Sequence, residues 1–165
     1  LENLPGLILE TQVLHQTGVA NLSEVEKLSQ AALIGASFEN RYKAVSYLTD
    51  TLRAAFDAAD LVVARAGSAT LFEIAAFGVP AIVIPLSGSA NDHQRANAYA
   101  FAESGAAVVI EESNLLPGIL PNEVKKILSD DALQEKMSAA TKQFFVPNAA
   151  ERIREGILKL VMKES

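Results

Sequence analysis

Residues 65–73, RAGSATLFE, combine the residue types that a nucleotide-binding site requires. Small and hydroxylated residues at the start of a helix leave backbone N–H groups accessible, and these groups together with the helix dipole bind phosphate. Glu73, one turn further on, can accept two hydrogen bonds from a sugar diol. The segment has neither the Gly-Lys-Ser/Thr of a Walker loop nor a G-x-G-x-x-G motif. The pattern is therefore typical of a phosphate at the helix start with a ribose beside Glu73.

The same segment also has a purely structural interpretation. Thr70 and Glu73 have the S/T-x-x-E spacing of a capping box, in which the threonine caps the helix and the glutamate returns a hydrogen bond. Gly78 suits the position just after a helix, and Pro80 prevents the helix from continuing. Gly67 can adopt unusual dihedral angles and permits close approach of a ligand to the backbone. The helix alone leaves both interpretations open.

Two further polar clusters occur at residues 91–94, Asn-Asp-His-Gln, and at residues 15–18, His-Gln-Thr-Gly. Side chains of the first cluster can contact sugar hydroxyls, or the segment can be a solvated loop in which Asp92 caps a helix. A single histidine at a strand end, such as His15, is more often structural than catalytic. If all these loops meet at one edge of a sheet, their convergence favours a binding site over separate structural roles.

Apolar strands alternate with helices through the first two thirds of the chain, which predicts one doubly wound, Rossmann-like parallel α/β domain. Capping residues are expected at Asn21 and Asp50. Ligands of such sheets bind at the carboxyl ends of the strands. The predicted strands are 11–16, 42–48, 61–64, 81–84 and 107–110, and the predicted helices are 21–34, 51–59, 70–77, 92–104, 121–128, 130–143 and 147–163. The loops after the strands are 15–20, 48–51, 65–70, 85–93 and 111–114.

The composition excludes several classes of function. A net charge of −6 argues against a broad basic face for nucleic acid. Without cysteine there is no disulfide or thiol chemistry, and two histidines argue against a histidine-based zinc site. No Asp-x-Asp pair or carboxylate cluster with metal spacing is present, so we expect no cofactor and no metal. Every apolar run is too short to span a membrane.

Three stretches of the sequence resemble the MurG family of GT-B glycosyltransferases. They are HQTG at 15–18, ADLVVARAGSATLFEIAAFGVPAIVIPL at 59–86, and NDHQRANA at 91–98, followed by GAAVVI at 105–110. The resemblance covers nearly the whole chain. It implies that residues 1–165 form a single donor-binding domain, one half of a GT-B enzyme, without the first strand, its Gly-rich loop and the N-terminal acceptor domain.

The resemblance implies roles for individual residues. The matching positions are Thr49 at the uracil, Ala69 and Thr70 at the diphosphate, Ser68 at the donor sugar, Glu73 at the ribose hydroxyls, and His93 with Gln94 at the GlcNAc hydroxyls. Arg65 and Gly67 shape the loop, and Asn97 braces the loop or packs the helix. His15 lies near this site, with no chemical step assigned to it.

The family's activity is transfer of N-acetylglucosamine from UDP-GlcNAc to lipid I, which gives lipid II for peptidoglycan. The resemblance implies that lipid I and the general base belong to the missing domain, and that this part neither touches the membrane nor catalyses transfer alone. It also implies a cytoplasmic location, with the full-length enzyme on the inner face of the bacterial cell membrane. Two alternatives are a stand-alone donor-binding subunit of a two-chain GlcNAc transferase and an enzyme that uses another UDP-sugar.

The last predicted helix has apolar residues at helical spacing, Ile153, Ile157, Leu160 and Val161. We expect this apolar face to pack against the core. The family resemblance offers a helix that bridges two domains as the alternative.

Overall fold

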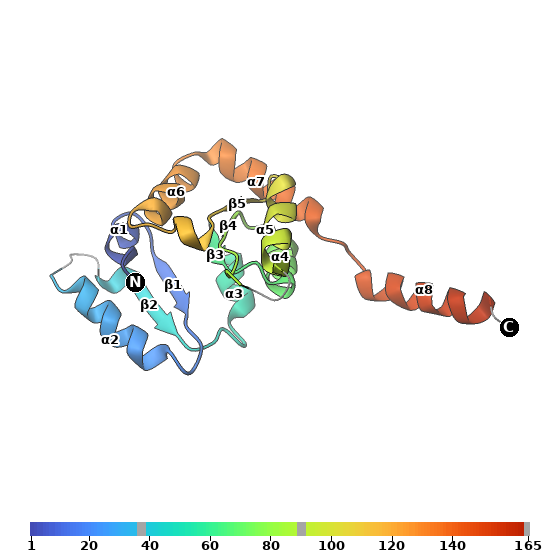
Figure 1. The fold of residues 1–165 in the computed structure, drawn as a ribbon, viewed down its shortest axis with the longest axis horizontal. Coiled ribbons are helices and arrows are strands. Elements are labelled where there is room, and N and C mark those ends of the chain that lie inside the picture. The colour runs from blue at the N-terminus through green and yellow to red at the C-terminus, as the bar shows by residue number, and fades with distance from the viewer. Residues whose placement is uncertain (36–38, 89–91, 164–165) are drawn as a thin grey trace.

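The computed structural model describes residues 1–35, 39–88 and 92–163 (Figure 1). The strands are β1 (Val13–Gln16), β2 (Tyr42–Val45), β3 (Val62–Ala64), β4 (Ala81–Val83) and β5 (Ala107–Val109). The helices are α1 (Leu4–Ile8), α2 (Leu22–Leu33), α3 (Leu52–Asp57), α4 (Ser68–Phe77), α5 (His93–Glu103), α6 (Ile119–Leu128), α7 (Asp131–Phe144) and α8 (Ala149–Lys163), with 3-10 turns η1 (Glu39–Arg41) and η3 (Glu112–Asn114). The predicted strands and helices all occur, in the predicted order, and α1 precedes them as an additional helix.

The strands form two parallel sheets, one of β1 and β2 and one in the order β3-β4-β5. The predicted parallel α/β architecture is confirmed, and the strands of the described residues divide into two sheets. A doubly wound sheet has the strand order 3-2-1-4-5-6. Here β2 and β1 correspond to strands 3 and 2, and β3, β4 and β5 correspond to strands 4, 5 and 6. Within the described residues, β1 and β3 do not pair with each other, and no strand lies between them.

Strand β4 is buried on both faces. Successive side chains of a strand point to opposite faces, and all three residues of β4 are buried. Ala81 and Val83 pack into one core with residues of α4 and α5, and Ile82 packs into a second core with residues of α6 and α7. The cores contain Leu71, Ile74, Ala98 and Phe101 on the first face, and Val124, Ile127 and Met137 on the second. Helices therefore cover both faces of the three-stranded sheet.

The two-stranded sheet has a smaller core, made with α1 and α2. Leu4 and Ile8 of α1 and Leu33 of α2 are buried together, and Val13 and Tyr42 of the strands pack against them. Helix α1 was not predicted from the sequence. This helix has five residues and contains both Pro5 and a glycine, which is why its pattern resembles a loop.

The structure corrects both predicted capping residues. Asn21 precedes α2, but its side-chain amide donates to the carbonyl of Thr17 at 3.0 Å and does not cap the helix. Thr51, and not Asp50, stands at the N-cap of α3, again without a side-chain cap. Sequence spacing identified where these two helices begin. The Asn21 side chain, however, bonds to the preceding loop, and no side chain caps α3.

The expectation that α8 packs against the core is wrong. Figure 1 shows α8 extending away from the other elements at the C-terminal end of the chain. Its apolar side chains are exposed, with 64% exposure for Ile153 and 70% for Leu160.

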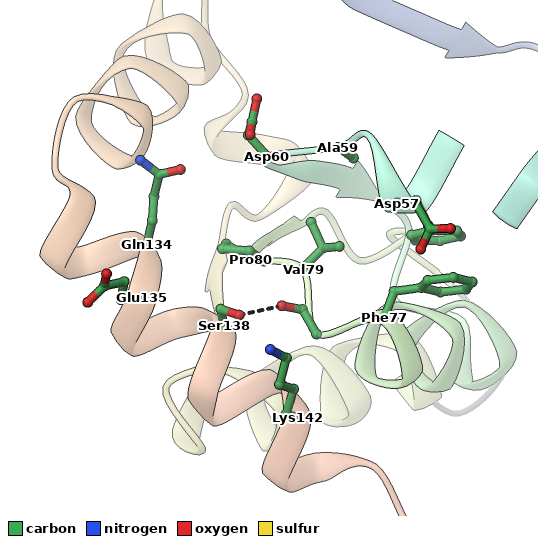
Figure 2. A pocket seen from close by; sticks show the side chains of 12 residues that line it. Asp57, Ala59, Asp60, Phe77, Val79, Pro80, Gln134, Glu135, Ser138 and Lys142 are labelled. Carbon is green, nitrogen blue, oxygen red and sulfur yellow. Dashed lines mark hydrogen bonds between the residues drawn. The ribbon is translucent and has the colours of Figure 1, made fainter. Parts of the chain in front are cut away.

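The junction after α4 is fixed by a glycine and by α7. Gly78 ends α4 in the left-handed conformation (φ 70°, ψ 31°), as its position in the sequence predicted. Its carbonyl accepts a hydrogen bond from Ser138 Oγ at 2.7 Å, and Figure 2 shows this bond beside Lys142. A Cβ at residue 78 would lie 2.4 Å from Lys142 Cε and 2.5 Å from Lys142 Cγ. Gly78 is therefore required both for its backbone angle and for the close approach of α7.

Replacing Gly78 with alanine is expected to reduce the free energy of unfolding by more than the same change at Gly35. Gly35 also has a positive φ of +77°, but a Cβ there would meet nothing within 4 Å. Its replacement should therefore cost only the left-handed conformation, about 1–2 kcal/mol. At Gly78 the side chain of Lys142 must also move. Chemical denaturation of the two variants measures the difference, and equal losses would show that the contact with Lys142 has no cost.

Candidate functional site

Helix α4 begins at Ser68, directly after β3, at the carboxyl end of the sheet. Gly67 is the N-cap residue, and no side chain caps the helix. The first helical hydrogen bond runs from the Leu71 amide to the Gly67 carbonyl at 3.0 Å. The amides of Ser68, Ala69 and Thr70 precede it and belong to the positive end of the helix dipole. The residues predicted to meet a diphosphate therefore supply the first-turn amides of α4.

The predicted capping box between Thr70 and Glu73 is wrong. Because α4 begins two residues earlier than expected, Thr70 is the third helical residue and Glu73 lies in the second turn, beyond reach of the N-cap. Glu73 is exposed. Its carboxylate is therefore not occupied in a capping box and lies one turn from the amides of the first turn.

Gly67 does not adopt an unusual conformation. Its φ of −67° and ψ of 139° are available to any residue, so this part of the sequence argument is wrong. A Cβ at this position would meet only Thr70 Oγ1, at 3.9 Å. Neither the backbone angles nor the neighbouring described residues therefore require glycine at residue 67.

Hydrogen bonds join the loop after β3 to the elements that follow it. Asn97 of α5 donates from Nδ2 to the carbonyl of Ala66 at 3.2 Å, a contact that braces the loop. Arg65 donates from Nη1 to the carbonyls of Ile84 and Pro85, both at 3.4 Å. The loops after β3 and β4 are thus held together at one edge of the sheet.

Two adjacent carboxylates after β5 complete this network. Glu112 Oε1 accepts from Arg65 Nη2 at 2.6 Å, and its Oε2 accepts from the Ser87 amide at 3.1 Å. Glu111 Oε1 accepts from Arg95 Nε at 3.0 Å and from the Tyr99 hydroxyl at 2.8 Å. The loop 111–114 was predicted to lie at this edge, but neither glutamate was predicted to have a role. Two consecutive acids at a strand end, opposite arginines after the neighbouring strands, were the signal that could have found them.

Its neighbours favour the ionised form of the Glu112 side chain over the protonated form. Its hydrogen bond from Arg65 contributes most, followed by hydrogen bonds from Ser87, and together they lower the pKa of Glu112 from 4.5 to about 2. The carboxylate therefore stays ionised at neutral and mildly acidic pH. Both side chains remain partly open to solvent, at 48% for Arg65 and 34% for Glu112, so the pair adds little to global stability.

The cluster at residues 91–94 is only partly described. Asn91 lies outside the described residues. Asp92 is the N-cap of α5 and has a φ of 53°, but its side chain does not cap the helix. His93 is exposed, and Gln94 Oε1 accepts a hydrogen bond from the Leu86 amide at 3.0 Å. With its oxygen engaged, Gln94 retains its Nε2 donors for a ligand.

His15 belongs to β1 of the two-stranded sheet, and Thr49 lies in the loop that follows β2. His15 Nδ1 is 2.8 Å from the Tyr42 hydroxyl, and the two rings are in edge contact. Burial lowers the pKa of His15 below its usual value. Thr49 is exposed, and its carbonyl accepts from the Leu52 amide at 3.4 Å. His15 therefore has a structural partner, whereas Thr49 lies in the open loop after β2.

Within the described part of the chain, two cavities lie away from this edge. One, of about 360 Å³, lies between α3, α4 and α7 beside Val79 and Pro80, at the amino end of β4 (Figure 2). The other, of about 460 Å³, lies between α1 and α6. None of the predicted site residues lines either cavity. Because ligands of doubly wound sheets bind at the carboxyl ends of the strands, we place the candidate site at the open edge formed by α4, α5 and η3.

The parallel sheet, covered by helices on both faces, places the chain in the class of doubly wound α/β domains. Residues 2–153 match the family model of the glycosyltransferase family 28 C-terminal domain. The chain belongs to this family.

Several known proteins are similar to the chain. The UDP-N-acetylglucosamine–N-acetylmuramyl-(pentapeptide) pyrophosphoryl-undecaprenol N-acetylglucosamine transferase of Idiomarina loihiensis is 35% identical over 145 residues, which cover 88% of this chain and 39% of that protein. The protein of the same name from Acetivibrio thermocellus is 46% identical over 109 residues, 66% of this chain and 29% of that protein. The chain thus spans about two fifths or less of the length of these relatives.

Solved structures support the same assignment of the fold. The crystal structure of MurG from Acinetobacter baumannii has a TM-score of 0.77 and 29% identity, and the match covers 96% of this chain and 45% of that one. The glycosyltransferase VinC, in complex with DTDP, has a TM-score of 0.63 at 20% identity and shows similarity of fold alone. Within the described residues, we find no helix long and apolar enough to cross a membrane and no cluster of three potential metal ligands.

Replacing Glu112 with glutamine is expected to lower stability only slightly at neutral pH, because both partners are partly exposed, and not at all near pH 2. A carboxyl whose pKa is lowered by folding stabilises the folded state above its unfolded pKa, and this contribution disappears as the pH falls through the folded value. For Glu112 the loss should occur between pH 4.5 and about pH 2. Urea denaturation of wild type and E112Q across this range measures it. If the difference in free energy of unfolding between wild type and E112Q stayed constant down to pH 2, it would contradict the lowered pKa of Glu112.

Proposed function

We propose that this chain is the donor-binding part of a glycosyltransferase that transfers N-acetylglucosamine from UDP-GlcNAc to the lipid-linked acceptor lipid I, giving lipid II. The observation that carries the proposal is the uncapped first turn of α4 with the exposed Glu73 one turn further on. The names of the relatives, which specify an N-acetylglucosamine transferase acting on a pyrophosphoryl-undecaprenol, support the substrates.

The first-turn amides of α4 suit the diphosphate of the donor. In the reaction, the acceptor oxygen forms a bond to the anomeric carbon of GlcNAc with inversion, and the bond from that carbon to the β-phosphate oxygen breaks. UDP leaves with the bonding electrons, so negative charge develops on its diphosphate. Aligned amides and the positive end of a helix stabilise such charge without reorganising. The role proposed for Ser68, Ala69 and Thr70 is thus stabilisation of the leaving group.

Other residues at this edge provide recognition. The exposed carboxylate of Glu73 can accept two hydrogen bonds from the ribose diol. Gln94 can donate to a sugar oxygen, because its own oxygen is engaged by Leu86. His93 and Ser68 complete the sugar side, and a backbone group of Thr49 contacts the uracil. The loop residues Arg65, Gly67 and Asn97 support these contacts.

Acceptor binding and proton removal are assigned to a part of the enzyme outside residues 1–165. The proton of the acceptor hydroxyl passes to a base in that part, and the chain alone is expected to bind donor weakly without transferring sugar. The exposed apolar residues of α8 suit a contact with another domain. Because lipid I is membrane-linked, the complete enzyme would act at the inner face of the cytoplasmic membrane.

Replacing Glu73 with glutamine is expected to weaken binding of UDP about tenfold. A glutamine loses the charge-assisted hydrogen bonds to the ribose, and hydrogen bonds to charged groups contribute about 1.5–3 kcal/mol. NMR titration of ¹⁵N-labelled protein with millimolar UDP measures the affinity. The largest wild-type shifts should occur at residues 67–73. The same change at the exposed Glu135 of α7, near the opposite edge, is the control. Absence of shifts at 67–73 in wild type would refute the site assignment.

Replacing Gly67 with alanine is expected to preserve folding but weaken UDP binding severalfold. The backbone angles suit alanine, and its Cβ would contact only Thr70 Oγ1. Exchange of glycine for alanine at an N-cap changes stability by no more than about 1 kcal/mol. In the complex, the methyl group would obstruct the approach of phosphate to the backbone. Thermal denaturation and the UDP titration test the two parts separately, and unchanged affinity would show that no ligand approaches residue 67.

A further inference from the structure

Glu112 connects three segments at the edge of the three-stranded sheet. One carboxylate oxygen accepts from Arg65, in the loop after β3, and the other accepts from the Ser87 amide, in the loop after β4. Glu112 itself begins η3, after β5. A single side chain thus fixes the relative positions of the segments that follow all three strands.

The segment after β4 is held at two consecutive amides. The Ser87 amide donates to Glu112, and the preceding Leu86 amide donates to Gln94 Oε1. Arg65 holds the two carbonyls just before them, those of Ile84 and Pro85. The orientation of the Gln94 amide consequently depends on a backbone segment that Arg65 and Glu112 keep in place.

Global stability does not account for this arrangement. The two charged side chains are partly exposed, and exposed ion pairs contribute little to stability. The hydrogen bonds, in contrast, are directional. Glu112 accepts from the Ser87 amide, which is adjacent to the Leu86 amide that donates to Gln94. Their geometry suits the positioning of Gln94.

We propose that Glu112 is a positioning residue that fixes Gln94 so that its Nε2 group faces the sugar of a bound nucleotide sugar. The inference rests on the proposed function, because it requires that Gln94 meets the sugar and not the nucleotide. Glu112 does not touch the ligand. It acts through the Leu86–Ser87 backbone, and loss of Glu112 should therefore affect the sugar and spare the nucleotide.

The test compares UDP-GlcNAc with UDP on wild type, E112A, Q94A and the double variant. E112A should weaken the binding of UDP-GlcNAc about three- to tenfold, as expected for one hydrogen bond. The affinity for UDP should change less than about twofold. In the Q94A background E112A should have no further effect, because residues that act through one contact are not additive. E112Q, which retains an oxygen for the Ser87 amide, should recover part of the affinity. E103A, at the exposed far end of α5, is the control.

A second measurement needs no ligand. If Glu112 holds Leu86 and Ser87, hydrogen exchange of the Leu86 amide should accelerate about tenfold or more in E112A, and the side-chain amide signals of Gln94 should shift. Unchanged exchange and unchanged Gln94 signals would overturn the inference. So would equal weakening of UDP and UDP-GlcNAc, or additive effects of E112A and Q94A. Failure of wild type to bind either compound would refute the proposed function, while the exchange measurement would still decide the role of Glu112.

Discussion

Burial of β4 on both faces is the constraint on which the rest of the structure depends. Its residues alternate between a core shared with α4 and α5 and a core shared with α6 and α7. Parallel pairing with β3 and β5 then fixes where the neighbouring strands end. The loop after each strand can reach the others only because this register holds all three carboxyl ends at one edge. The polar network of Arg65, Gln94 and Glu112 is a consequence of that alignment.

The sequence predicted most of the architecture, because the relevant signals were local. Buried parallel strands such as β4 are continuous apolar runs, and Gly78 marks the end of α4 through its left-handed conformation. Errors arose where a side chain had more than one possible partner. Asn21 bonds to the preceding loop, and α4 begins early enough that Thr70 no longer occupies a capping position. Spacing identifies a possible hydrogen bond, whereas the tertiary structure selects which bond is made.

The candidate site was predictable in part for the same reason. The first turn of α4 and Glu73 belong to one short segment, so their proximity follows from helical geometry. The contacts of Glu112 join residues 47 and 25 positions apart in the sequence, and no local pattern determines that pairing. The exposure of α8 was also unpredictable from its periodicity, because an amphipathic helix shows which face is apolar but not whether the domain has a surface left to cover it.

The division of the strands into two sheets has a consequence for ligand affinity. Thr49 and His15 belong to the pair β1–β2, whereas the first turn of α4 follows β3 in the other sheet. A nucleotide that contacts a base-binding loop on one sheet and a phosphate-binding turn on the other must span both. The cost of holding the two sheets in one alignment would then reduce the observed binding free energy. By thermodynamic linkage, a nucleotide bound at the proposed site would stabilise the alignment of the two sheets and hence the folded chain.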